Sequence, residues 1–367
     1  MLLPEIIKQK IHEEGPICFY DFMEMCLYYP ELGYYNSIKN KIGWDGDYYT
    51  SPYLTSIFGE IIGKQLEEMW GLLGKGKFTL VEYGAGTGVL CQSILCYLKH
   101  NKALYDQLNY CIVEKSAAMR EKEKMILCEK VSWHESIQDI APVKGCILSN
   151  EVVDNFSVHQ VVMKDELMEV FVGFNDGFIE MLQPASPPLK DYLNELKIIL
   201  PKGFRTEINL QAIDWMKEIG AALQKGFVVT IDYGFPSSEL YSSHRSQGTL
   251  LCYHKHKINA CPYSNIGEQD ITAHINFSAL RHWGLKNGLE YSGFANQTHF
   301  LLALGLVNHL REAETSIAGG YENYKKKFFL INSLLMDMGT KLKVLIQYKG
   351  IEQPSLMGLK FPQQFIL

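Results

Sequence analysis

The stretch from residue 78 to residue 88 reads FTLVEYGAGTG, a short apolar run that enters a glycine-rich turn. The run predicts a buried strand, and the residues that follow, VLCQSILCYLKH, predict a helix. Glycine accepts a positive φ and lets a ligand approach the backbone closely. The first turn of a helix adds unpaired N–H groups and the positive end of the helix dipole. This strand–turn–helix unit therefore predicts a site for the carboxylate of a bound ligand.

The spacing of the glycines separates two classes of nucleotide-binding enzyme. Dinucleotide enzymes carry G-x-G-x-x-G, but the third glycine position is Val89 in this chain. Methyltransferases favour an acidic residue followed by G-x-G-x-G, and Glu82 supplies the acid. The alternative is a purely structural turn that only links a strand to a helix. This alternative has to be considered because single glycine motifs give many false positives. The loop residues expected to bind a cofactor are Gly84, Ala85, Gly86, Thr87 and Gly88.

A second acidic residue supports the prediction that the glycine loop binds a cofactor with a nucleoside part. The next apolar run, LNYCIVE, ends at Glu114. An ionised carboxylate at that position accepts hydrogen bonds from the two hydroxyls of a ribose. The matching positions of Glu82 and Glu114 at the ends of consecutive strands favour a nucleoside cofactor such as S-adenosyl-L-methionine over a turn that only links a strand to a helix.

Strand and helix patterns alternate over the middle of the chain, which predicts an α/β fold. We expect a Rossmann-like, seven-stranded, mostly parallel sheet of the class I methyltransferase type, with helices on both faces. The last strand, KLKVLIQYK, is expected to pair antiparallel. The predicted parts are an N-terminal helical cap (1–75), a core (76–154 and 205–367) and a segment inserted after strand four (155–204).

Polar residues directly follow the fourth predicted strand, KGCILS, in the order Asn150, Glu151 and, three residues later, Asp154. Ligands of doubly wound sheets bind beyond the carboxyl ends of the strands, so we expect these three as catalytic residues. Paired carboxylates suit a cationic acceptor such as a guanidinium, and they can localise electron density on one nitrogen. The alternative is that Asp154 or Glu151 only caps the next helix.

Taken together, several blocks resemble the MidA family of class I methyltransferases, over about residues 4–300. Its eukaryotic members include a mitochondrial complex I assembly methyltransferase that acts on arginine. The resemblance implies that the loop from Gly46 to Pro52 covers the cofactor, which adds Thr50 and Ser51 to the cofactor site. It also implies a protein substrate, with a respiratory complex I subunit as the first candidate. The blocks are FYDFMEMCLYYPELGYY, GDYYTSPYLTSIFGE, VEYGAGTG, IVEKS, LSNEVVDNFSVHQ, VVTIDYG, GTLLCYHKH and GEQDITAHINFSAL.

The composition of the chain bears on its partners, its location and its capacity to bind a metal. The 367 residues carry a formal net charge of -6 without a long Lys/Arg stripe, which argues against nucleic acid as a partner. No apolar run reaches the length of a membrane span, so we expect no membrane insertion. The nine cysteines are scattered without a Cys-x-x-Cys pair, which favours free thiols and a cytoplasmic chain. No Cys/His spacing indicates a metal, and His254, His256 and His274 are interpreted as ordinary loop or capping residues.

Three other functions stay open at the level of sequence. The chain could bind S-adenosyl-L-methionine only as an assembly scaffold, or it could methylate a small molecule. A nicotinamide-dependent oxidoreductase is disfavoured by Val89. The sequence does not fix the oligomeric state, for which a homodimer is one hypothesis.

Overall fold

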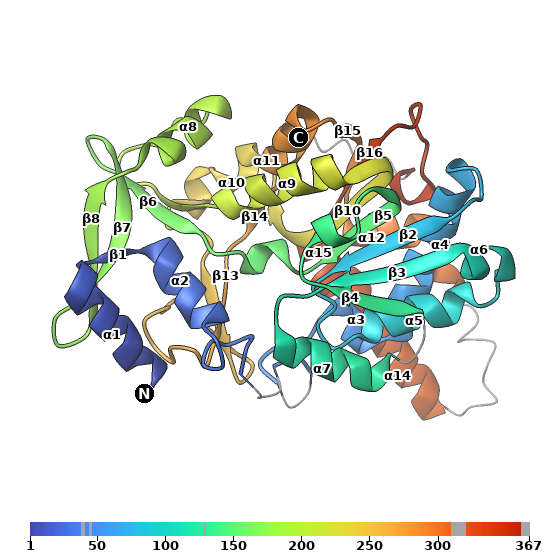
Figure 1. Cartoon of the computed structure of the whole chain (residues 1–367), viewed down its shortest axis with the longest axis horizontal. Coiled ribbons are helices and arrows are strands. Elements are labelled where there is room, and N and C mark those ends of the chain that lie inside the picture. Colours follow the sequence, from blue (N-terminus) through green and yellow to red (C-terminus); the bar gives the residue numbers. More distant parts are fainter. Residues whose placement is uncertain (38–40, 44–45, 128–129, 310–320, 361–367) are drawn as a thin grey trace. The chain divides into compact units, whose positions relative to one another are not determined.

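The computed structural model describes residues 1–37, 41–43, 46–127, 130–309 and 321–360 (Figure 1). The chain divides into two compact units, and each is described by itself. Unit 1 comprises residues 1–48, 153–215 and 235–280, and unit 2 comprises residues 49–152, 216–234 and 281–367.

Unit 2 is built on a mixed sheet with the strand order β15-β16-β10-β5-β2-β3-β4. The five strands from β10 to β4 are parallel, whereas β16 runs antiparallel between β10 and β15. The antiparallel pairing of the last strand was predicted, although it lies inside the sheet. This path has seven strands, and the two-residue strand β14 (Ile275–Asn276) also pairs with β10, which makes eight. The bounds are β2 Phe78–Tyr83, β3 Leu108–Val113, β4 Val131–His134, β5 Val143–Asn150, β10 Leu223–Phe235, β15 Glu290–Asn296 and β16 Leu342–Lys349.

The central strands are buried over consecutive residues, as expected for a sheet that is covered on both faces. On one face, alternate residues such as Leu80, Ile112 and Leu148 join a core cluster with the apolar sides of helices α4 and α5. Helix α4 starts where Thr55 caps it by accepting a hydrogen bond from the Ile57 amide. The helices of unit 2 include α3 Ser51–Leu54, α4 Ser56–Leu72, α5 Val89–Leu98, α6 Lys102–Gln107, α7 Ala117–Ile126, α12 Gln297–Ala303, α14 Tyr321–Asn332 and α15 Met338–Lys341.

Unit 1 contains two smaller sheets. One has the order β1-β7-β6-β9, with β8 paired along β7, and the other has the order β12-β11-β13. Helices α1 and α2 pack on the first sheet through a core that includes Ile7, Phe22 and Val170. The helices and strands of unit 1 are α1 Leu3–Glu14, β1 Ile17–Cys18, α2 Phe19–Tyr28, β6 His159–Met163, β7 Leu167–Phe174, β8 Phe178–Pro184, α8 Pro187–Glu195, β9 Arg205–Ile208, α10 Ser237–Leu240, β11 Leu251–His254, β12 Lys257–Asn259 and β13 Asp270–Thr272.

Two helices pass from one unit into the other along the chain, namely α9 (Leu210–Ala222) and α11 (Phe277–Lys286). Between β15 and β16 the chain forms α12, α14 and α15, while residues 310–320 lie outside the described part. Among the helices described, none combines the length and apolar character that crossing a bilayer requires.

Candidate active site

The glycine loop connects β2 to α5 in the left-handed backbone conformation that its sequence predicts. Gly84, Gly86 and Gly88 have φ values of 58°, 61° and 77°. The Gly84 amide donates to the Val113 carbonyl at 3.0 Å, and the Gly88 amide donates to the Ala85 carbonyl at 2.9 Å. Since the N-cap of α5 is a glycine, no side chain occupies the first-turn N–H groups of this helix.

The space beside the loop depends on its glycines, which carry no side chain. A Cβ atom added to Gly84 would lie 3.1 Å from Val152 Cγ2, and one added to Gly88 would lie 3.2 Å from Leu127 Cδ1. An alanine at either position would be strained by the positive φ and would require the neighbouring side chain to shift. The loop is a backbone cradle with free donors, which suits the carboxylate of an amino-acid moiety.

The two predicted acids lie on adjacent parallel strands at the same edge of the sheet. Glu82 is opposite Ile112 in the β2–β3 register, and Glu114 follows the end of β3. Glu82 is 2% exposed and its Oε2 accepts a hydrogen bond from Tyr110 at 2.7 Å. Glu114 is half-buried and its Oε1 accepts from the Ser116 amide at 2.7 Å. Burial raises the pKa of each carboxyl to about 7.

A third acid of this region, Glu123 on α7, was not predicted. It is fully buried, and its Oε2 accepts a hydrogen bond from Trp133 Nε1 at 2.7 Å. Its other oxygen has no hydrogen-bond partner among the described residues. Burial, and then the charge of Glu114, raises the pKa of the Glu123 carboxyl to about 8. No motif marks Glu123, because it occurs in an ordinary charged helix; its contact with the glycine loop, where its Cα would lie 3.7 Å from a Gly88 Cβ, is visible only in three dimensions.

Asn150 and Glu151 lie where β5 ends, as predicted. Glu151 has a φ of 54°, an uncommon conformation for a residue with a side chain, and its amide donates to the Ile231 carbonyl at 2.8 Å. Its Oε1 accepts from Asn150 Nδ2 at 3.2 Å. The Oδ1 atom of Asn150 is buried and lacks a partner within the described chain. Burial, and then the charge of Asp232, raises the pKa of the Glu151 carboxyl to about 8.

The loop predicted to cover the cofactor meets this second site. The Ser51 amide donates to Glu151 Oε1 at 3.2 Å, and Ser51 Oγ accepts from Gln297 Nε2 at 3.1 Å. Ser51 is fully buried, while Thr50 precedes α3 without making a capping side-chain bond. The structure thus brings a predicted cofactor residue into contact with a predicted catalytic residue.

Asp232 on β10 completes this group in unit 2. It is fully buried; its Oδ2 accepts from the Val152 amide at 3.2 Å and its Oδ1 from the Tyr233 amide at 2.8 Å. Asp232 thereby holds the backbone that carries Glu151.

Asp154 belongs to unit 1, unlike the other predicted catalytic residues. It is buried within a short 3₁₀-helix, Val153–Asn155, and its carbonyl accepts from the Ala273 amide at 2.9 Å. The alternative that Asp154 is a helix cap does not describe this position, since the residue lies inside the 3₁₀ turn. Its catalytic role stays a prediction.

Comparison with known families agrees with this geometry. A family model described as "Putative S-adenosyl-L-methionine-dependent methyltransferase" matches residues 61–295, more than half of the chain. The matched region includes the glycine loop, both predicted acids and the Asn150-Glu151 pair.

Individual relatives cover most of the chain. A protein arginine methyltransferase NDUFAF7 homolog, mitochondrial, from Caenorhabditis elegans is 27% identical over 93% of this chain and 85% of its own length. The Drosophila melanogaster homolog is 25% identical over 95% of this chain and 85% of its own length. A crystal structure of a Burkholderia thailandensis protein bound to S-adenosyl-homocysteine has a TM-score of 0.86 at 28% identity, covering 97% of this chain and 94% of that one. This likeness confirms the predicted class I methyltransferase α/β fold with a mixed sheet.

Proposed function

Because the chain belongs to this family of S-adenosyl-L-methionine-dependent methyltransferases, we propose that it methylates an arginine side chain of a protein substrate. The relatives from Caenorhabditis elegans and Drosophila melanogaster are named protein arginine methyltransferases, which supports a guanidinium as the acceptor. The observation that carries the proposal is Glu151, a half-buried carboxyl group in a strained backbone conformation at the end of β5.

The donor set of unit 2 fits S-adenosyl-L-methionine. The N–H groups at the start of α5 would receive its carboxylate, and Glu114 would accept hydrogen bonds from its ribose hydroxyls. The cofactor supplies a methyl group that is activated by attachment to a sulfonium sulfur. A cationic ligand beside Glu82, Glu114 and Glu123 would favour the ionised forms of these carboxyls, whose pKa values burial has raised.

The acceptor side is assigned to Asn150 and Glu151. Asn150 Oδ1, for which the described residues offer no hydrogen-bond donor, can accept an N–H of the guanidinium. Glu151 Oε1 is held by Ser51 and Asn150, so its Oε2 is the atom that we assign to the substrate. A guanidinium donates to carboxylates in forked geometry, and this contact would localise electron density on the attacking nitrogen. A guanidinium bound beside Glu151 would lower the raised pKa of this carboxyl, and the ionised carboxylate could then receive the proton that the methylated nitrogen releases.

A neutral acceptor would gain less from this arrangement. Two carboxylates, Glu151 and Asp232, lie close enough for the charge of one to raise the pKa of the other. A cation placed between such groups relieves their repulsion, whereas a neutral amine or hydroxyl does not. This charge pattern favours a guanidinium over a small neutral molecule.

Further parts of the proposal rest on the family resemblance and on composition. We assign a subunit of respiratory complex I as the first substrate to test, and a homodimer as the first oligomeric state. Residues 1–75 would act as a cap, and 155–204 as an insertion into a seven-stranded core. Composition favours the cytoplasm, while the animal relatives are named mitochondrial. Imaging of a fluorescent fusion, with an organelle marker as the reference, tests the compartment.

The test of the proposal is mass spectrometry of arginine methylation in cells with and without the gene, with the Glu151→Gln variant returned as a control. We expect a set of methylarginine sites that disappears with the gene and does not return with the variant. A methylproteome that is unchanged by deletion, from a protein that still binds S-adenosyl-L-methionine, would contradict catalysis and support the scaffold function.

A further inference from the structure

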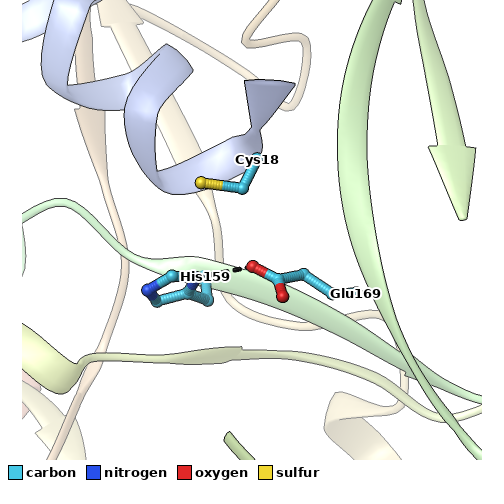
Figure 2. A group of neighbouring side chains, drawn as sticks. All are labelled: Cys18, His159 and Glu169. Atoms are coloured by element: carbon cyan, nitrogen blue, oxygen red, sulfur yellow. Dashed lines mark hydrogen bonds and ion pairs between the residues drawn. The ribbon is translucent and has the colours of Figure 1, made fainter. Parts of the chain in front are cut away.

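Three side chains of metal-ligating type gather in unit 1, namely Cys18, His159 and Glu169 (Figure 2). One ligand atom from each residue can be chosen so that all three lie within 4.8 Å of one another. His159 Nδ1 and Glu169 Oε1 are 2.6 Å apart. Glu169 is 4% exposed, and the other two residues are half-buried. The group therefore combines a thiol, an imidazole and a carboxylate in a place that water reaches only in part.

Strand pairing explains why residues so far apart in sequence meet. Strand β8 pairs along one edge of β7, so β1 and β6 share the other edge. Cys18 is opposite Phe171, and Val161 is opposite Glu169. His159 is the first residue of β6 and lies two residues before Val161 on the same strand. Alternate residues of a strand point to the same face, so all three ligand-type side chains lie on one face of the sheet.

We propose that Cys18, His159 and Glu169 bind one Zn²⁺ ion. Sulfur, imidazole nitrogen and carboxylate oxygen are the ligands that zinc takes in proteins, and three protein ligands leave a fourth position for water. The Asp21 carboxylate, a neighbour of the Cys18 thiol, is an alternative fourth ligand. A thiolate and a carboxylate together neutralise the double charge of the ion.

An aromatic contact supports the assignment of the His159 imidazole as a zinc ligand. The ring of Tyr20 stacks on His159 with centroids 5.0 Å apart and an interplanar angle of 13°. Such a contact fixes the ring plane, which is the role that outer partners play at metal sites. The ion would tie β1, which leads into α2, to the β6–β7 hairpin. Zinc binding would therefore stabilise unit 1, independently of methyl transfer.

Cobalt provides the probe, because Co²⁺ replaces Zn²⁺ and reports thiolate coordination by absorbance. The full chain is stripped with a chelator and titrated with Co²⁺ and then with Zn²⁺. We expect one cobalt ion per chain with a sulfur-to-cobalt charge-transfer band, displacement of cobalt by zinc, and a higher melting temperature with zinc. Cys18→Ser should abolish the band, while Cys261→Ser, which removes an exposed cysteine of the same unit, should leave it unchanged.

Glu169→Gln is the second test variant, because a glutamine can keep a hydrogen bond to His159 and so preserve the fold. It should weaken zinc binding by more than the roughly 10–100-fold that loss of an outer partner costs. His12→Ala, which removes an exposed histidine, should change nothing. The proposal is overturned if the wild type binds neither metal, if the charge-transfer band persists in Cys18→Ser, or if folded Glu169→Gln binds zinc as tightly as the wild type.

Discussion

Glu151→Gln is the substitution that separates catalysis from cofactor binding. The glutamine oxygen can still accept the bonds from the Ser51 amide and from Asn150 Nδ2, each 3.2 Å long in the wild type. The local fold should therefore survive. The substitution removes the negative charge of Glu151, which we propose binds the guanidinium of the substrate. Loss of one electrostatic contact to a reacting group typically costs about 3–4 kcal/mol, which corresponds to roughly a 10²–10³-fold lower kcat.

The same substitution has a signature in stability that does not depend on the substrate. The pKa of Glu151 is about 8 in the folded protein and about 4.3 for an unperturbed glutamate. Because the folded state holds its proton longer, the contribution of Glu151 to stability is fully present below the unfolded pKa. It is lost as the pH rises through the folded pKa, at up to about 1.4 kcal/mol per pH unit. Glu151→Gln should remove this part of the pH dependence.

The assay combines three measurements on the wild type, Glu151→Gln and the exposed control Glu352→Gln. Calorimetry should give the same affinity of all three for S-adenosyl-homocysteine. Methyl transfer to the protein substrate should drop only in Glu151→Gln. Urea unfolding of the cofactor-free proteins at several pH values should show a flatter profile for Glu151→Gln alone. Wild-type turnover by Glu151→Gln on the true substrate would refute the assignment of this carboxylate.

Further predictions concern the cofactor site and its charges. Gly84→Ala should weaken S-adenosyl-homocysteine binding about tenfold or more in calorimetry, because an alanine at a φ of 58° is strained. The control Gly71→Ala, whose added Cβ meets no other atom, should bind the ligand normally. Glu114→Gln should also weaken binding roughly tenfold through loss of charged hydrogen bonds to the ribose, with the exposed Glu121→Gln as the control; equal affinities of the two variants would exclude the ribose contact. The free energy of unfolding of the cofactor-free protein should fall as the pH rises from about 5 to about 8, since the raised pKa of Glu123 makes the folded state hold a proton longer, and Glu123→Gln should reduce this slope in urea titrations.

The core of the fold was predictable because its signals are local. Glu82 directly precedes the glycine loop, and Glu114 ends the next strand along the chain, so both could be placed on one sheet edge from the sequence. The pair Asn150-Glu151 could be placed for the same reason, since it ends a predicted strand. In each case the site residue lies at the end of a strand that the local sequence predicts.

Residues that meet through long-range packing were not predictable. Glu123 reaches the glycine loop from a helix whose sequence carries no distinguishing pattern. Cys18, His159 and Glu169 converge because β1 pairs with a strand more than a hundred residues away in sequence, and the search for metal ligands by spacing passed over them. The pairing of the N-terminal strand with the inserted hairpin depends on tertiary contacts that no periodicity encodes.

The central claim is that the side-chain-free turn between β2 and α5, together with Glu114, holds S-adenosyl-L-methionine. A crystal structure of the wild type grown with S-adenosyl-homocysteine tests it most directly. The account predicts the ligand carboxylate at the first-turn N–H groups of α5 and the ribose hydroxyls within hydrogen-bond distance of Glu114. Ligand density elsewhere on the molecule, with the 84–88 loop empty, would contradict it.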